Sequence, residues 1–414
     1  KAEPAADGTY KISGTKIFIS AGEHDLTENI IHIVLARHPD APAGTRGISL
    51  FIVPKFIPTA DGGVGERNTV SCGSIEHKMG IHGNATCVIN FDQAKGYLIG
   101  PENRGLNCMF TFMNTARIGT AVQGLSASES SFQGALAYAK DRLAMRSLSG
   151  PKAPEKEADP IIVHPAVRNM LLTQKSFAEG GRALVYLLAQ YADIVEKGET
   201  EEERKFADNI LSLLTPIAKA FLTETGSESA KHGVQVFGGH GFISEHGMEQ
   251  IVRDTRISQI YEGTNGIQSL DLLGRKVVKN GGAFVTTYVQ EMRDFANNMN
   301  ADHAIKQAIL TSADKLEDLT KAVVAAAAVN KDEINGCAVD YLQAFGYVSF
   351  AYMFGLMVEA ANGKEGDFYA NKAKLADYYV GRMLPRLDAH IAMVKATSQP
   401  ITAFDRDYFA ATIA

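Results

Sequence analysis

Residues 259–268 read Gln-Ile-Tyr-Glu-Gly-Thr-Asn-Gly-Ile-Gln and place one carboxylate, that of Glu262, between an aromatic ring and a flexible turn. A carboxylate in such a loop can accept a proton from carbon when a substrate is held against it. Upstream, residues 234–242 read Val-Gln-Val-Phe-Gly-Gly-His-Gly-Phe, where Gly238 and Gly239 allow the backbone to approach a ligand closely. Both stretches separate helical patterns, so they indicate ligand-facing turns within a helical domain.

The residues around these two turns repeat their apolar side chains at helical spacing. We expect long helices over residues 101–146, 165–197, 201–232 and 264–278. After the glycines at 281 and 282 the same period returns over residues 288–299, 304–329, 338–361 and 368–394. Pro385 should kink the last of these helices.

The start of the chain carries strand signals instead. Residues 29–36 and 47–53 are β-branched runs bounded by Pro and Gly, and residues 10–20 suggest a hairpin with Ser13 and Gly14 near its turn. The sequence therefore predicts an α+β chain, with a β domain over residues 1–97, a helical domain over 101–279 and a further helical region over 283–414.

Composition excludes several classes of protein. The chain has 414 residues, of which 45% are hydrophobic and 21% charged, and its net charge is −6. This charge argues against nucleic acid or an anionic membrane as the main partner. Four cysteines, none in CxxC spacing, indicate neither a disulfide framework nor a metal site, and a reducing, cytoplasmic location fits them.

One apolar stretch, residues 342–358, has no charged residue and could be mistaken for a membrane span. It contains Gln343 and Ser349 and is shorter than the roughly 20 residues that a bilayer requires. We expect a buried core helix and no membrane association. The chain begins at Lys1 without the pattern of a signal peptide, so we expect it to start inside a longer protein.

The two turns and the order of the segments resemble the acyl-CoA dehydrogenase family, from the start of the chain to about residue 279. In that family an amino-terminal helical domain precedes a middle β domain and a four-helix-bundle domain, and FAD lies between the last two. Residues 283–414 resemble the extra helical carboxy-terminal domain of larger members, 3-methylmercaptopropionyl-CoA dehydrogenases among them. We expect this chain to lack the amino-terminal helical domain and the first strand of the β domain. The extension implies a homodimer, because it covers the surface that smaller relatives use to form tetramers.

The resemblance assigns several residues to FAD. Lys16 to Ser20 is similar to the family's Lys-x-Trp-Ile-Thr strand, which implies that Phe18 packs beside the isoalloxazine ring and Ser20 hydrogen-bonds near N5. Gln235, Gly238 and Gly239 resemble a turn that approaches the FAD adenylate across a dimer interface.

Two further FAD contacts follow from the same resemblance. Arg142 keeps the register of an arginine that meets the FAD pyrophosphate, and Arg146 is the alternative. Thr264 resembles a threonine that touches FAD, although Gly266 stands where the family often has Gln.

Glu262 matches the family's catalytic base in Tyr-Glu-Gly-Thr, which implies that it removes the α-proton of an acyl-CoA thioester while flavin N5 accepts the β-hydride. Some members place the base on the long helix instead, where this chain has Ala116. Tyr261, Gly263 and Arg117 are implied to lie at the substrate. The backbone N–H of Glu262, with a flavin hydroxyl, is implied to polarise the thioester carbonyl.

The function implied is FAD-dependent α,β-dehydrogenation of an acyl-CoA, with electrons passed to an electron-transferring flavoprotein. An acyl-CoA oxidase of the same fold is the nearest alternative. A noncatalytic, DNA-associated relative that binds flavin is a second alternative, but it requires a basic surface, and 41 basic against 47 acidic residues give no sign of one. The acyl chain of the substrate stays open.

Overall fold

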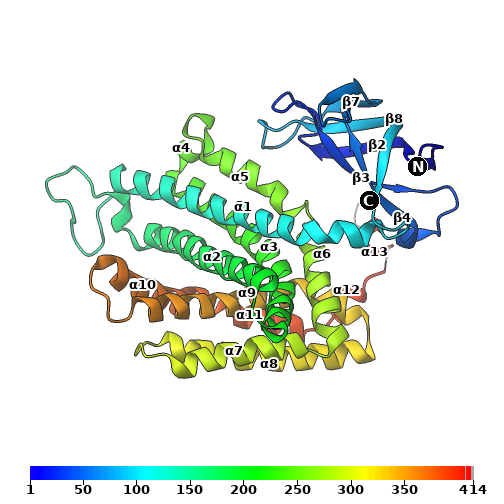
Figure 1. Ribbon diagram of the computed structural model, residues 1–414. Helices are drawn as coiled ribbons and strands as arrows, with labels where there is room; N and C mark the ends of the chain where they lie inside the picture. The colour runs from blue at the N-terminus through cyan, green and yellow to red at the C-terminus, as the bar shows by residue number, and fades with distance from the viewer. Residues whose placement is uncertain (406, 412–414) are drawn as a thin grey trace. The chain divides into compact units, whose positions relative to one another are not determined.

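The computed structural model describes residues 1–405 and 407–411 and divides the chain into two units, Lys1–Thr115 and Ala116–Ala414 (Figure 1). The first unit carries the strands and the second the helical hairpins. The fold class predicted from the sequence, α+β with β and helical domains, is confirmed.

The first unit is an antiparallel β structure around one long strand, β8. Its larger sheet has the order β1-β2-β8-β4-β3, and β7 also pairs with β8. Cys87, Ile89 and Phe91 of β8 point into the core because successive side chains of a strand alternate between its two faces. The strands are β1 (Ala2–Pro4), β2 (Tyr10–Ser20), β3 (Ile31–Arg37), β4 (Ile48–Pro54), β5 (Phe56–Pro58), β6 (Val64–Arg67), β7 (Val70–Ile75) and β8 (Thr86–Ile99), with a 3₁₀ turn η1 (Gly44–Gly47) before β4.

Strand β2 corrects one prediction. Residues 10–20 form a single strand that pairs with β8 from Tyr10 opposite Gly96 to Ser20 opposite Thr86, and not a hairpin. The Ser13-Gly14 signal marks a shift in register instead, at which Gly14 takes a φ of 142°. Glycine tolerates this conformation, so it serves a bulge as readily as a turn.

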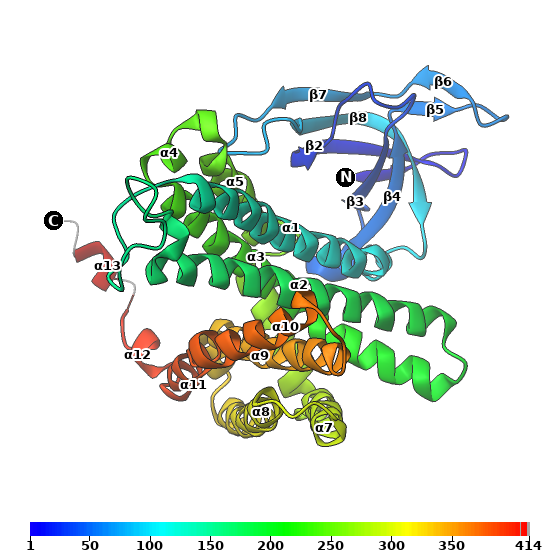
Figure 2. The same ribbon diagram turned by 90° about the vertical axis from the view of Figure 1, so that its left-hand side faces the viewer.

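The second unit is helical, and a long loop over residues 142–164 joins its first two long helices, α1 and α2 (Figure 2). The first group comprises α1 (Gly105–Asp141), which begins in the first unit, η2 (Ile161–Val163), α2 (Pro165–Lys197), α3 (Glu201–Phe237), α4 (Gly239–Phe242), η3 (Ser244–His246), α5 (Met248–Arg256), η4 (Ile257–Gln259), α6 (Asn265–Leu270), a π-helical turn η5 (Asp271–Val277) and η6 (Val278–Asn280). The second group comprises α7 (Ala283–Asn298), α8 (Ile305–Val329), α9 (Asp332–Ala361), α10 (Asp367–Tyr378), a π-helical turn η7 (Tyr379–Met383), α11 (Arg386–Lys395), α12 (Gln399–Thr402) and α13 (Tyr408–Ala411). The predicted helices are present, but residues 264–278 form an α-helix, a π-helical turn and the start of a 3₁₀ helix and not one continuous helix.

Glycines bring α1 and α3 close together. A Cβ on Gly124 would lie 2.2 Å from the carbonyl oxygen of Leu222, and one on Gly226 would lie 2.5 Å from that of Gly124. No side chain fits there, so the two helix backbones touch at this level. The contact sets α1 beside the part of α3 that carries the polar residues described below.

Helix α3 has clear signals at both ends. The Thr200 side chain accepts a hydrogen bond from the amide of Glu203 at the start, and three glutamates occupy the first turn, where the helix dipole favours negative charge. At the other end Gly238 adopts φ 60° and ψ −134°, a conformation that is essentially restricted to glycine. The glycine turn of the sequence is therefore the end of α3.

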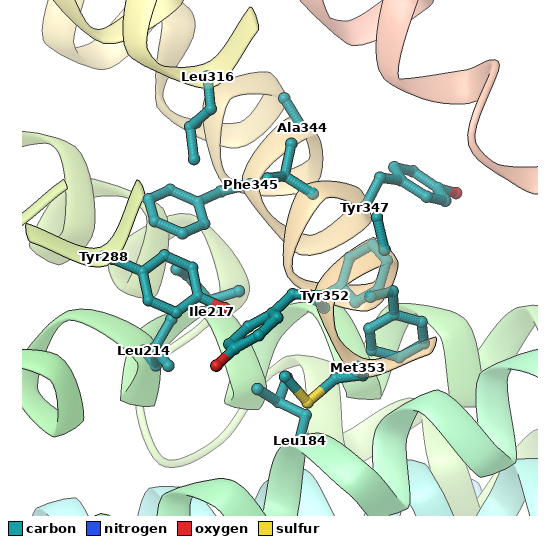
Figure 3. Packing of buried hydrophobic residues seen from close by; sticks show 14 of the residues in the cluster. Leu184, Leu214, Ile217, Tyr288, Leu316, Ala344, Phe345, Tyr347, Tyr352 and Met353 are labelled. Atoms are coloured by element: carbon teal, nitrogen blue, oxygen red, sulfur yellow. The ribbon is translucent and has the colours of Figure 1, made fainter. Parts of the chain in front are cut away.

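Helix α9 forms the centre of the main core. Phe345 and Met353 of α9 pack with Tyr288 of α7 and with Leu184 and Ile217 of the first helical group (Figure 3). By length and composition α9 could cross a membrane, but 72% of its most apolar window is buried inside the protein. The structure thus places it as the core helix that the sequence predicted.

Pro385 interrupts the last long helical pattern, as expected. The chain leaves α10 through the π-helical turn η7, and α11 begins at Arg386 directly after the proline. A proline in this position cannot donate the hydrogen bond that a continuous helix requires.

Helices α7 and α8 lie side by side in both views (Figures 1 and 2).

Candidate active site

Glu262 lies in a short loop between η4 and α6, on a backbone of unusual conformation. Its φ is 55°, and that of Gly263 is 83°, so two consecutive residues are left-handed. For a residue with a side chain this conformation costs roughly 1–2 kcal/mol. Gly263 must be glycine for a second reason, because a Cβ there would lie 2.5 Å from the Gln268 amide nitrogen.

Two buried side chains bind the carbonyl groups of this loop. Lys219 Nζ donates to the carbonyl of Gly263 at 2.8 Å and to Asn265 Oδ1 at 2.9 Å, while Gln268 Nε2 donates to the carbonyl of Glu262 at 3.1 Å. Lys219 and Gln268 are both 0% exposed. Burial lowers the pKa of Lys219 to about 8, although Glu224 and Glu262 oppose this shift and Arg117 adds to it.

A polar row on α3 extends this support to both sides of the loop. Glu224 accepts hydrogen bonds from Gln259 Nε2 at 2.5 Å, before the loop, and from Asn265 Nδ2 at 2.8 Å, after it. Thr223 also bonds to Asn265. The residues that flank Glu262 are thus held to one face of α3.

The Glu262 side chain itself has no such partner. It is half-buried, and no described residue donates a hydrogen bond to its carboxylate or forms an ion pair with it. Its amide N–H and that of Gly263 also donate to none of the residues that the structure covers. The loop therefore presents a carboxylate and two N–H groups that are available to a substrate.

Tyr261 and Thr264 fix the two ends of the loop. The Tyr261 hydroxyl donates to Gln123 of α1, and burial raises its pKa. Thr264 is the N-cap of α6, where its hydroxyl oxygen accepts a hydrogen bond from the amide of Ile267 at 3.1 Å. The hydroxyl proton of Thr264 has no acceptor within the described part of the chain and is available to donate.

Arg117 has a partner that the sequence did not indicate. It is buried on α1 and forms an ion pair of 3.0 Å with Asp271 in η5, which Arg275 also contacts at 2.8 Å. The Nε atom of Arg117 is buried and has no hydrogen-bond partner among the described residues. A substrate contact for Arg117 stays a prediction, and its interhelical role is the one that the structure describes.

The glycine turn at the end of α3 faces open space. A Cβ on Gly238 or Gly239 would meet nothing within 4 Å, and Gln235 is exposed. Phe237 stacks on Tyr138 of α1 at 4.1 Å between ring centres, and the Tyr138 hydroxyl bonds to His240 at 2.8 Å. The turn is therefore anchored on α1 by aromatic rings while its backbone stays accessible.

The two candidate arginines differ in their surroundings. Arg146 donates to Asp159 at 3.2 Å, to the carbonyl of Ala153 at 2.9 Å and to the carbonyl of Lys156. Backbone amides, that of Ser147 first, hold the pKa of the fully buried Asp159 well below its usual range. Arg142 is exposed, and no described residue pairs with its guanidinium. Arg146 thus organises its own loop, which leaves Arg142 free for a ligand.

Phe18 and Ser20 belong to the first unit. Phe18 has a φ of 60° at the second register shift of β2, and the residue is 68% exposed. Bulky residues rarely adopt this conformation, and such outliers are concentrated at functional sites. Ser20 is exposed two residues further along.

Lys219, Gln268 and Asp271 were missed from the sequence. The signal for Lys219 was a charged residue within the apolar run from Ile217 to Leu222. Gln268 ends the quoted motif, but its partner is a backbone carbonyl, which no side-chain pattern reveals. Asp271 has no local signal, since its partner lies 154 residues away.

Comparison with known proteins adds independent observations. Residues 103–277 match the family model for the acyl-CoA dehydrogenase C-terminal domain, and residues 288–405 match the model described as acetyl-CoA dehydrogenase C-terminal like. The chain is 40% identical to the 3-methylmercaptopropionyl-CoA dehydrogenase of Ruegeria pomeroyi, over 97% of its own length and 69% of the relative's. It is 31% identical to the broad-specificity linear acyl-CoA dehydrogenase FadE5 of Mycobacterium tuberculosis, over 99% and 71%.

The fold has known relatives as well. An acyl-CoA dehydrogenase of Bacillus anthracis, solved with FAD, has a TM-score of 0.72 at 19% identity and covers all of this chain, which spans 67% of that structure. The two family models and the two relatives, of which the chain covers 69% and 71%, all indicate the same family. The chain belongs to the acyl-CoA dehydrogenase family of oxidoreductases.

Proposed function

We propose that this chain carries the catalytic centre of an FAD-dependent acyl-CoA dehydrogenase, in which Glu262 removes the α-proton of an acyl-CoA thioester. The observation that carries this proposal is the Glu262 loop. Its carboxylate has no partner among the described residues, while the carbonyls on its own backbone are bound by buried Lys219 and Gln268. A base that is held in place but not neutralised is what proton abstraction from carbon requires.

The residues assigned to FAD fit such a group. The unpaired guanidinium of Arg142 suits a pyrophosphate, for which charge-assisted hydrogen bonds are strong. The absence of side chains at Gly238 and Gly239 leaves room beside the backbone for a large ligand. Thr264 keeps a hydroxyl proton to donate. When bound, FAD supplies the acceptor for the hydride that leaves the β-carbon.

The residues of the chain supply the proton chemistry. The Glu262 carboxylate takes the α-proton and becomes a carboxylic acid, while the electron pair of the broken C–H bond forms the new bond between the α- and β-carbons. Negative charge develops on the thioester oxygen during this step. The amide N–H of Glu262, free of partners among the described residues, is available to stabilise that charge.

Three further properties belong to the same proposal. The relatives named above act on acyl-CoA thioesters by their names, which supports an acyl-CoA substrate here. Electrons pass to an electron-transferring flavoprotein, and the functional unit is a homodimer in which the Gln235 turn reaches the partner's FAD. Four free cysteines suit a cytoplasmic location.

The experiment is a screen of acyl-CoA thioesters of different chain length against the full-length, FAD-loaded protein under anaerobic conditions. We expect the preferred thioester to bleach the flavin, and the panel identifies its acyl chain. A protein that retains FAD and is bleached by no acyl-CoA contradicts the proposal.

Mixing the reduced protein with air in a stopped-flow instrument separates a dehydrogenase, whose flavin reoxidises slowly, from an oxidase. Light scattering that finds a monomer with full FAD content excludes the homodimer.

A further inference from the structure

We infer that Lys219 is a positioning residue for the proposed base, and that with Gln268 it keeps the Glu262 backbone left-handed so that the carboxylate projects toward the substrate. This inference deepens the proposed function and rests on it. It concerns residues that lie outside the FAD and substrate contacts assigned above.

Lys219 lies where an apolar residue would be expected. Its neighbours Ile217, Ala218, Ala220 and Phe221 are all buried in the helical core. Burying an ammonium group costs hydration free energy unless hydrogen bonds inside the protein offset this cost. The two hydrogen bonds of the Lys219 ammonium group go to the Gly263 carbonyl in the loop and to Asn265, the first residue of α6 directly after it.

The loop requires support of this kind. A left-handed residue with a side chain persists only where surrounding contacts over-determine it. Here the carbonyls of Glu262 and Gly263 both point to buried donors, Gln268 and Lys219 respectively. If Lys219 loses its donor, the Gly263 carbonyl is left without a partner in a partly buried place, and rotation of the peptide toward water also rotates the backbone of Glu262.

The consequence is a displaced carboxylate. A shift of about 1 Å in a catalytic group can lower a rate by roughly 10²-fold, because proton transfer requires close and aligned atoms. Tyr261, which the family resemblance places at the substrate, keeps its own hydrogen bond to Gln123 of α1, so affinity should change much less than rate. This separation distinguishes positioning from a general role in folding.

The first test is Lys219→Met, which keeps the length and apolar stem of the side chain and removes its donor. Lys231→Met is the matched control, because Lys231 is exposed on the same helix, twelve residues along. We expect Lys219→Met to lower the anaerobic bleaching rate per bound flavin by roughly 10- to 100-fold, with the Kd for acyl-CoA changed less than about threefold. Lys231→Met should bleach at the wild-type rate.

The second test does not depend on activity. Hydrogen exchange followed by mass spectrometry reports on the amides of Tyr261 and Gln268, which are hydrogen-bonded on either side of Glu262. We expect both to exchange faster in Lys219→Met and not in Lys231→Met. This arm reports on the loop even if no acyl-CoA bleaches the wild-type protein, so failure of the proposed function and failure of this inference are distinguishable.

Gln268→Met provides an independent variant if Lys219→Met does not fold. It removes the donor to the other carbonyl and should lower the rate and loosen the loop in the same direction. Wild-type bleaching and wild-type exchange in a folded Lys219→Met protein overturn the inference. So does a variant that loses stability while its rate per bound flavin is unchanged, because Lys219 then serves only packing.

Discussion

Arg117 and Asp271 form an ion pair of 3.0 Å between α1 and the π-helical turn η5, with both side chains more than 90% buried. The pair ties the helix that carries Ala116 to the segment that follows the Glu262 loop. π-Helical turns within helices occur frequently at functional sites. Asp271 is the first residue of this turn.

The first prediction concerns this pair. Asp271→Asn removes the negative charge and leaves Arg117 buried without compensation, which should lower the free energy of unfolding by roughly 3 kcal/mol. Arg275→Gln is the control, because its side chain is 59% exposed, and it should cost less than about 1 kcal/mol. Urea denaturation measures both. Equal, small effects would show that the buried pair contributes no more than an exposed one.

The second prediction separates the two arginines after α1. Arg142→Gln should weaken FAD binding by roughly 10- to 100-fold, the value of one charge-assisted hydrogen bond, and leave the stability of the apoprotein unchanged. Arg146→Gln should instead lower apoprotein stability, because Arg146 joins Asp159 to two carbonyls of its loop. FAD titration followed by fluorescence, with thermal melting of each apoprotein, makes the comparison. The reverse pattern would assign the pyrophosphate to Arg146.

The third prediction is a pH dependence that arises from Lys219. Burial lowers its pKa from 10.5 to about 8, so between these two values the unfolded chain holds a proton that the folded protein has lost. Stability rises with pH wherever the unfolded state binds more protons. The wild-type protein should therefore gain stability relative to Lys219→Met as the pH rises from 8 to 10.5. Urea midpoints of both proteins at pH 8 and pH 10 give the change in stability of each protein with pH. An equal change in the two proteins would contradict a lowered pKa of Lys219.

The fourth prediction concerns acid. Glu228 of α3 accepts two hydrogen bonds from Arg386 of α11, at 3.0 and 2.9 Å. Burial raises the pKa of Glu228, but His232 and Arg386 outweigh burial and bring it to about 2. The stabilisation is present above pH 4.5 and is lost as the pH falls toward 2. Between pH 5 and pH 3 the wild-type protein should lose about 2 kcal/mol more than Glu228→Gln. Matching losses in the two proteins would refute a depressed pKa.

Local patterns predicted most of the fold. Periodicity predicted α2 over residues 165–197, as observed, and β-branched runs predicted β3 and β4 within two residues. The β2 prediction was wrong because Ser13-Gly14 carries the same local signal for a turn and for a bulge. Which of the two forms is decided by β8, about 75 residues away in the sequence.

The candidate site was predicted unevenly for a similar reason. The Tyr-Glu-Gly-Thr motif pointed to Glu262 through its resemblance to the family, and the role of Glu262 as the base stays a prediction. Its supporting groups are long-range, since Lys219 reaches Gly263 across 44 residues and meets a carbonyl that every residue type possesses. The sequence could not show which of Arg142 and Arg146 is available to FAD. The difference between them arises from Asp159, which binds Arg146 from the loop after α1, and helical periodicity does not predict the position of a loop residue.

The central claim is that Glu262 is the base, and Glu262→Gln in the full-length protein tests it most directly. The amide keeps the size of the side chain but not its basicity, so folding, FAD content and acyl-CoA binding should be retained. Loss of a positioned base typically lowers a rate by roughly 10²- to 10⁴-fold, and Ala116 offers no second carboxylate in this chain. Adding Ala116→Glu to the variant is a control that should restore part of the rate. We predict that anaerobic bleaching by the preferred acyl-CoA nearly disappears in Glu262→Gln, and bleaching at a rate near that of the wild-type protein would show that Glu262 is not the base.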